Sequence, residues 1–127
     1  MESIYLDTHV VVWLFSGETK KISNKAIEKI ETSELLISPI VMLELTFLYE
    51  IKRLNYKQDE IIASLSKSID LKICNASYAS IIKQSTQLNW TRDPFDRLIV
   101  ASAEYNNHSV LLSRDRLIRK NYDNAVW

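Results

Sequence analysis

Short apolar runs alternate with amphipathic stretches along the whole chain. The runs are aliphatic and bounded by polar or turn-forming residues, as buried strands are, and we expect strands at residues 3–6, 34–38, 69–74, 109–113 and 125–127. Between them apolar positions recur at helical spacing, and we expect helices at residues 9–15, 23–32, 40–54, 57–67, 75–88 and 93–103, with a short helical turn at 116–120. Strands that alternate with helices predict an α/β sandwich, in which a parallel sheet is covered on both faces.

Residues that favour helix starts mark several of these boundaries. Ser23 and Asn75 are candidate caps, and Pro39 ends a strand and suits the first turn of the next helix. Asp93 is followed by Pro94, a pairing typical of a cap and the first helical position. We therefore expect a helix to begin at this Asp-Pro pair.

The composition fits one globular domain. With 127 residues, 46% of them hydrophobic, the chain can bury a core unaided, and we expect a single domain over residues 1–127. Sixteen basic and sixteen acidic residues balance, so any attraction to nucleic acid must be local. No apolar run approaches the roughly 20 residues of a membrane span. Cys74 is the only cysteine, which favours a reducing compartment, so we expect a cytoplasmic protein without a membrane partner. A single glycine, Gly17, excludes P-loop and GxGxxG nucleotide sites.

Two acids follow predicted strands. Asp7 comes directly after the first strand, and Asp115 lies two residues beyond Ser113, which ends another strand. Ligands of parallel sheets bind beyond the carboxyl ends of the strands, where the strand order reverses. A turn or cap role explains either acid alone, but both are expected at the ligand-binding edge.

Two further acids lie on predicted helices and face inward. Glu44 has only apolar neighbours three and four positions away, so it must be protonated, paired with a cationic side chain or bound to a cation. Asp96 lies above the apolar stripe formed by Ile99 and Ala103. Capping by Asp93 and a favourable helix dipole at Asp96 would also account for this pair.

These acids together predict a metal site. If they converge at one sheet edge, their mutual repulsion requires a bound cation. The ligands are oxygens, with no grouping of His or Cys, so the expected metal is Mg²⁺ or Mn²⁺ rather than zinc. A hard metal with open positions suits phosphodiester hydrolysis by an activated water.

Four motifs carry a resemblance to a known family. They are YLDTHVVVWL at the start, SPIVMLEL around Glu44, then RDPFDRLIVASA and LLSRD. In this order the chain resembles PIN-domain ribonucleases, most closely the VapC-type toxins of toxin-antitoxin pairs. The resemblance implies a three-layer α/β sandwich around a mostly parallel five-stranded sheet. It also implies a metal-dependent endoribonuclease that acts as a toxin, uses Mg²⁺ or Mn²⁺, and forms no covalent intermediate with RNA.

The resemblance further implies roles for individual residues. The catalytic and metal-binding acids would be Asp7, Glu44, Asp96 and Asp115. Supporting roles would fall to Asp93, Ser113 and Thr8, with Asp93 mainly a helix cap and an indirect metal role left open. One departure is Val41, where relatives often carry Ser or Thr, which alters the surroundings of the ligands but leaves the ligands intact.

The implied partners are an RNA substrate, a cognate antitoxin protein and a second copy of the chain in a homodimer. Basic residues flank the acids, and the candidate contacts to RNA phosphates are Arg92, Arg97, Arg114 and Arg116. A solvated surface is the alternative for these four arginines.

Other conspicuous side chains are expected to be structural. His9 and His108 lack a second ligand at metal-binding spacing, so we expect ordinary structural or surface roles. Trp13 is expected in the core or at a dimer contact, Trp90 in packing rather than base stacking, and Cys74 in the core.

Two alternative functions compete with the nuclease. One is a PIN-like module that binds a protein partner without catalysis. The other is a phosphoryl-transfer domain, such as a response-regulator receiver or a haloacid-dehalogenase-like phosphatase. Against the latter, the first strand ends in Asp7-Thr8-His9 without a second nearby acid, and no lysine follows a late strand.

Overall fold

The sheet has five strands, and every neighbouring pair is parallel. The computed structural model describes residues 1–127, and its strands are β1 (Ser3–Leu6), β2 (Glu34–Ile37), β3 (Lys72–Ile73), β4 (Val110–Leu112) and β5 (Ala125–Val126). They lie in the order β3-β2-β1-β4-β5. The predicted five-stranded α/β architecture is confirmed, and the sheet is parallel throughout.

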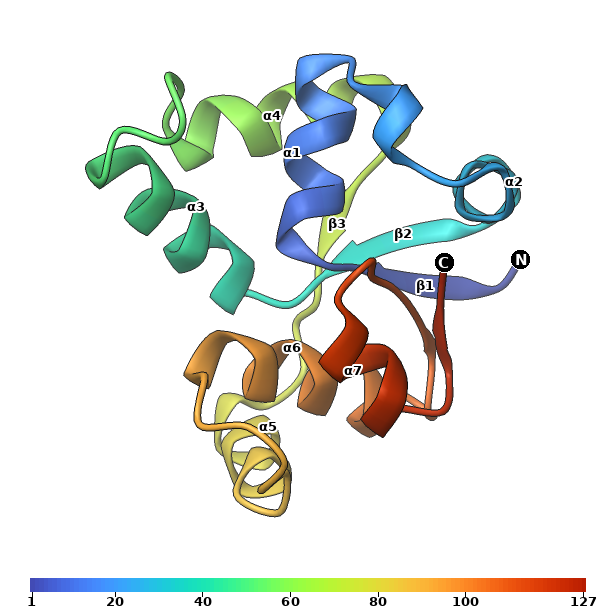
Figure 1. Cartoon of the computed structure of the whole chain (residues 1–127), viewed down its shortest axis with the longest axis vertical. Helices are drawn as coiled ribbons and strands as arrows, with labels where there is room; N and C mark the ends of the chain where they lie inside the picture. Colours follow the sequence, from blue (N-terminus) through green and yellow to red (C-terminus); the bar gives the residue numbers. More distant parts are fainter.

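Helices cover both faces of this sheet (Figure 1). The first four are α1 (Thr8–Ser16), α2 (Asn24–Thr32), α3 (Ile40–Glu50) and α4 (Gln58–Ile69), with a 3₁₀ turn at Thr19–Lys21. The last three are α5 (Tyr78–Ser85), α6 (Pro94–Tyr105) and α7 (Arg116–Asn121). Crossovers between parallel strands are right-handed, so connections that run in opposite directions along the sheet fall on opposite faces. In Figure 1, α1, α2 and α4 accordingly lie above the sheet, and α5, α6 and α7 lie below it.

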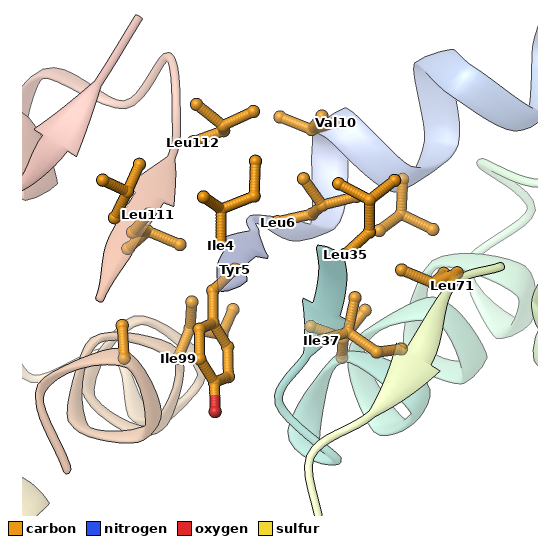
Figure 2. Packing of buried hydrophobic residues seen from close by; sticks show 14 of the residues in the cluster. Ile4, Tyr5, Leu6, Val10, Leu35, Ile37, Leu71, Ile99, Leu111 and Leu112 are labelled. Carbon is orange, nitrogen blue, oxygen red and sulfur yellow. The ribbon is translucent and has the colours of Figure 1, made fainter. Parts of the chain in front are cut away.

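The central strand β1 is buried on both faces. Ile4, Tyr5 and Leu6 are fully buried. Figure 2 shows Ile4 and Leu6 pointing to the side of Val10 on α1, whereas Tyr5 points to the side of Ile99 on α6. A strand covered on both faces needs a continuous apolar run rather than alternation, which is the pattern the sequence has.

The strand expected at residues 69–74 is shorter than predicted. Helix α4 continues to Ile69, and Asp70 ends it in the left-handed conformation, at φ 55°. Only Lys72 and Ile73 then pair with β2 as strand β3.

Two of the predicted helices have wrong boundaries. The helix expected over residues 75–88 runs over Tyr78–Ser85 and is capped by Ser77, whose Oγ accepts a hydrogen bond from the Ser80 N–H. Asn75 does not cap this helix because the chain is still leaving the sheet there: the Cys74 N–H donates to the Ile37 carbonyl at 2.8 Å. The helix expected over residues 40–54 ends at Glu50, and Lys52 beyond it has a positive φ of 63°.

None of the seven α-helices combines the length and the apolar character needed to cross a membrane.

Candidate functional site

The site lies where the strand order reverses. The chain leaves β1 towards β2 and β3 on one side, then returns to the other side of β1 as β4 and β5. Leu6 at the end of β1 pairs with Leu112 at the end of β4, and the next residue, Asp7, donates its N–H to the Leu112 carbonyl at 3.0 Å. Asp7 and the segment from Ser113 to Asp115 therefore leave neighbouring strands at one edge of the sheet.

A cleft of about 390 Å³ opens at this edge and is predominantly acidic. Its lining residues are Asp7, His9, Val10, Trp13, Glu44, Asp93, Asp96, Arg114 and Asp115. The structure thus brings the four predicted catalytic acids together, and Asp93 with them. They come from the start of α1, the middle of α3, the start of α6 and the start of α7.

Asp7 is fixed by the backbone and by Ser113. It is 7% exposed, its Oδ1 accepts from the Thr8 N–H at 2.8 Å, and its Oδ2 accepts from the Ser113 hydroxyl at 2.6 Å. The Ser113 oxygen also accepts from the Asp115 N–H at 3.1 Å. One buried hydroxyl therefore links the two acids that follow neighbouring strands.

Glu44 reaches the same cleft from α3. The hydroxyl of the buried Thr8 donates to the Glu44 carboxylate, which joins α1 to α3 across the cleft. Glu44 is partly buried, as its apolar neighbours predict, whereas Val41, one turn earlier, is fully buried in the core. Thr8, rather than a hydroxyl at position 41, is the side chain that holds Glu44.

Asp93 and Asp96 share the first turn of α6 but differ in their contacts. Asp93 is exposed and caps the helix, because its Oδ1 accepts from the N–H groups of Phe95 at 2.8 Å and of Asp96 at 3.4 Å. Asp115 caps α7 in the same way, through the Ile118 N–H at 2.9 Å. The Asp96 carboxylate accepts no hydrogen bond from the protein and is free to bind a ligand.

Burial and crowding raise the pKa of three of these acids. Burial raises the pKa of Asp96 to about 7, and the charges of Asp93, Asp7, Asp115 and Glu44 add to the rise. Burial also raises the pKa of Asp7 and Glu44, against the hydrogen bonds from Ser113 and Thr8 that lower it. Their surroundings in the cleft therefore disfavour the charged forms of Asp7, Glu44 and Asp96.

No basic side chain neutralises these acids. The ion pairs of the chain involve other carboxylates, and none of the cleft acids has a Lys, Arg or His nitrogen within salt-bridge distance. An all-oxygen, carboxylate-rich set fits a hard divalent cation. The side chains do not form a complete coordination site, however, because no group of three or more His, Cys, Asp or Glu side chains is arranged to hold a metal ion.

Of the four arginines predicted to meet RNA, Arg114 is the one that lines the cleft. Arg97 is half-buried, and its Nε donates to the Thr91 carbonyl at 2.9 Å. Arg92 is exposed, with an Nη that donates to the Asn89 carbonyl at 3.3 Å. Arg116 is exposed at the first position of α7.

Sequence reasoning missed the cleft positions of His9 and Trp13. His9 is exposed in the cleft, and its positive charge when protonated lowers the pKa of Asp7 and of Glu44. Trp13 packs partly against the core, as expected, but its ring also lines the cleft. The available signal was their spacing: they lie four residues apart on the helix that begins after Asp7, so they share a face.

The remaining singled-out residues lie elsewhere. His108 pairs with Asp123 outside the cleft. Trp90 packs against the core, and buried Cys74 accepts a hydrogen bond from the Tyr5 hydroxyl at 3.0 Å.

The fold is an α/β sandwich, and its acidic cleft lies where the strand order reverses, which is the place where open parallel sheets bind their ligands. Within this fold class the chain belongs to the PIN domain family, whose model matches residues 4–124.

Several solved structures share the fold. VapBC2 from Rickettsia felis, bound to a DNA fragment from its promoter, matches with a TM-score of 0.65 at 19% identity, over 94% of this chain and 92% of that chain. A toxin-antitoxin complex from Klebsiella pneumoniae matches with a TM-score of 0.60 at 22% identity, over 88% and 86%. DNA-bound VapBC from Salmonella typhimurium matches with a TM-score of 0.61 at 16% identity, over 95% and 93%. No curated protein matches the chain in sequence.

Proposed function

We propose that this PIN domain is a divalent-metal-dependent endoribonuclease and the toxin of a toxin-antitoxin pair. The observation that carries the proposal is the meeting of five carboxylates in one cleft with no basic side chain within salt-bridge distance of any of them. Burial raises the pKa of Asp7, Glu44 and Asp96, and the charges of neighbouring acids add to the rise, so a bound cation would stabilise the charged forms of these carboxylates. A cation site open to solvent at a sheet edge is suited to a phosphate substrate.

The residues that would hold the metal are Asp7, Glu44, Asp96 and Asp115. Bound there, Mg²⁺ or Mn²⁺ would neutralise the phosphate and lower the pKa of a water for attack on phosphorus. Asp96 is the carboxylate with no competing protein donor, so it is the first ligand we expect.

The chain itself orients the reactants. Ser113 fixes the Asp7 carboxylate and the backbone of Asp115, and Thr8 fixes Glu44. Arg114 lines the cleft, and its guanidinium group can form an ion pair with an RNA phosphate. Water is the nucleophile: its oxygen bonds to phosphorus as the bond to the leaving nucleotide oxygen breaks, and no side chain becomes attached to the RNA.

The proposed toxin role and partners rest on the similarity of this chain to toxin-antitoxin structures and to VapC-type sequence motifs. The structures that share this fold are toxin-antitoxin assemblies, which supports a cognate antitoxin as a partner. An RNA substrate and a homodimer follow from the resemblance of the four sequence motifs to VapC-type toxins. A cytoplasmic location is proposed because the single cysteine favours a reducing compartment.

The decisive experiment is cleavage of RNA by the purified chain with Mg²⁺, with Mn²⁺ and with a chelator. We expect cleavage that the chelator abolishes and that Asp96→Asn reduces by at least about 100-fold, because the substitution removes a ligand charge. The matched control is Asp70→Asn, the same change at an exposed acid whose left-handed backbone Asn tolerates well. Undiminished cleavage by Asp96→Asn would exclude this cleft as the active site.

One observation favours a second candidate: no three of the carboxylates are arranged to hold a metal ion. That candidate is a PIN module that binds a protein partner without catalysis. Calorimetric titration with Mg²⁺ and Mn²⁺ distinguishes the two functions. A folded protein that binds neither ion and cleaves no RNA would be the binding module.

A further inference from the structure

Trp13 places an indole ring beside the cleft carboxylates. It lies on α1, six residues after Asp7, and lines the same cleft as Asp7 and Asp96. Apart from the acids, the lining consists of Trp13, His9, Val10 and Arg114. The lining of the cleft therefore combines five acids with an aromatic wall formed by Trp13 and His9.

Three side chains surround this ring, one from α1 itself and two from other parts of the chain. The His9 ring lies 6.0 Å from it, centroid to centroid, at an interplanar angle of 44°. The Trp127 ring, which follows β5, lies at 5.8 Å and 55°. The Arg114 guanidinium lies 5.9 Å from the ring centroid, within the range of a cation–π contact. A ring held from several sides loses little conformational freedom when a ligand stacks on it.

We propose that Trp13, with Arg114 beside it, is a stacking platform for an unpaired nucleobase next to the scissile phosphate. This inference rests on the proposed nuclease function and assigns Trp13 as the residue that selects an unpaired base beside the cut. An indole face stacks on any base, and Arg114 provides a cation for the phosphate that follows. Bases in a duplex are stacked on each other and cannot present a free face, so paired RNA is excluded from the platform.

The test compares a short unstructured oligoribonucleotide with a duplex of the same sequence. Binding is measured in the full chain carrying Asp96→Asn, which retains the cleft without cleavage, and cleavage is measured in the chain without that change. Trp13→Leu should weaken binding of the single strand by roughly 5- to 150-fold, the effect of one stacked base. It should raise KM more than it lowers kcat. Trp13→Phe, which keeps a smaller ring, should lose less, and Trp90→Phe is the control at a tryptophan that packs away from the cleft.

Fluorescence provides a second readout that does not depend on how well Trp13→Leu folds. Stacking of a base quenches the indole, so the single strand should quench the chain with all three tryptophans and quench Trp13→Phe much less. Equal quenching in both, unchanged affinity in a folded Trp13→Leu, or equal affinity for the duplex would overturn the platform. Failure of the unsubstituted chain to cleave any RNA with Mg²⁺ or Mn²⁺ would instead overturn the nuclease function itself, and the platform with it.

Discussion

Ser113 is the residue on which two of the cleft acids depend. Its buried hydroxyl donates to the Asp7 carboxylate and accepts from the Asp115 backbone. A buried carboxylate that loses a donor bears the full desolvation penalty of that group. The hydroxyl also opposes the burial that raises the pKa of Asp7. Ser113 therefore keeps Asp7 both oriented and ready to ionise.

We predict that Ser113→Ala lowers stability and shifts the pH dependence of cleavage. The free energy of unfolding should fall by about 1–3 kcal/mol, because Asp7 stays buried with one donor fewer. The pKa of Asp7 should rise further, so the acidic limb of the kcat/KM profile should move to higher pH. Urea unfolding and a pH–rate profile measure the two effects.

Ser102→Ala is the matched control for this prediction. Ser102 is also fully buried, and its hydroxyl contacts Ser38 and the Leu98 carbonyl, away from the cleft lining. The control should lose stability without moving the acidic limb. If both variants leave the limb in place, Ser113 is a packing residue and does not tune Asp7.

At the scale of the elements, the sequence predicted helix boundaries correctly where neighbouring residues alone determine them. The Asp93-Pro94 pair fixed the start of α6 because a cap and a proline at the first position act within one turn. The start of α5 was misplaced because Asn75 and Ser77 are both good caps, and the choice depends on the pairing of Cys74 with β2. Asp7 and Asp115 were found because strand ends share an edge of a parallel sheet. Glu44 and Asp96 were found because helical spacing places them on the inward, apolar side of their helices.

The aromatic wall could not be found in this way. Trp13 meets Trp127 and Arg114 only because β5 and the segment after β4 pass beside α1. The helical spacing of His9 and Trp13 indicates a shared face of α1, but the contacts of Trp13 with Trp127 and Arg114 are tertiary relations that no local pattern encodes.

Helix α6 provides a prediction at this scale, since Asp93 both caps it and adds charge to the cleft. We predict that Asp93→Ala destabilises the protein by about 0.5–2 kcal/mol because it leaves the first-turn N–H groups without an acceptor. Asp93→Asn keeps an oxygen acceptor at the cap and removes the charge, so its stability should remain close to that of the original chain.

Comparing the two variants defines the role of Asp93 in the reaction. Because its carboxylate is exposed and engaged as a cap, Asp93→Asn should retain cleavage within a few-fold, as measured by initial rates with Mg²⁺. A loss as deep as that of Asp96→Asn would show instead that the charge of Asp93 is needed for the metal.

For the molecule as a whole, folding brings mutually repelling carboxylates together at one edge of the sheet. The parallel sheet must bring together the segments after β1 and β4, because these strands are neighbours at its centre. Helices α3 and α6 then add Glu44 and Asp96 to the same cleft. Folding therefore always brings these carboxylates together. Their repulsion lowers the free energy of unfolding, and a bound cation would reduce that repulsion.

This coupling predicts an unusual dependence of stability on pH. The pKa of Asp96 is about 7 in the folded chain against 3.8 as the ordinary value, and the pKa values of Asp7 and Glu44 are also raised. Between these pH values the folded state holds protons on these acids that the unfolded state has released. The contribution of the three acids to stability is therefore greatest at low pH and falls as pH rises towards 7. Solvent reaches part of Asp96, which reduces its share of the effect to about 1–2 kcal/mol.

The measurement is the free energy of unfolding in urea at about pH 5.5 and about pH 8, with and without Mg²⁺. Without the ion the chain should be less stable at the higher pH, and Mg²⁺ should stabilise it more there, because protons no longer compete for the carboxylates. Asp96→Asn should stabilise the metal-free chain at the higher pH and reduce both effects, while it abolishes cleavage. A metal-free stability that rises with pH over this range, or an equal response to Mg²⁺ at both values, would mean that the cleft acids are relieved of their repulsion without a cation.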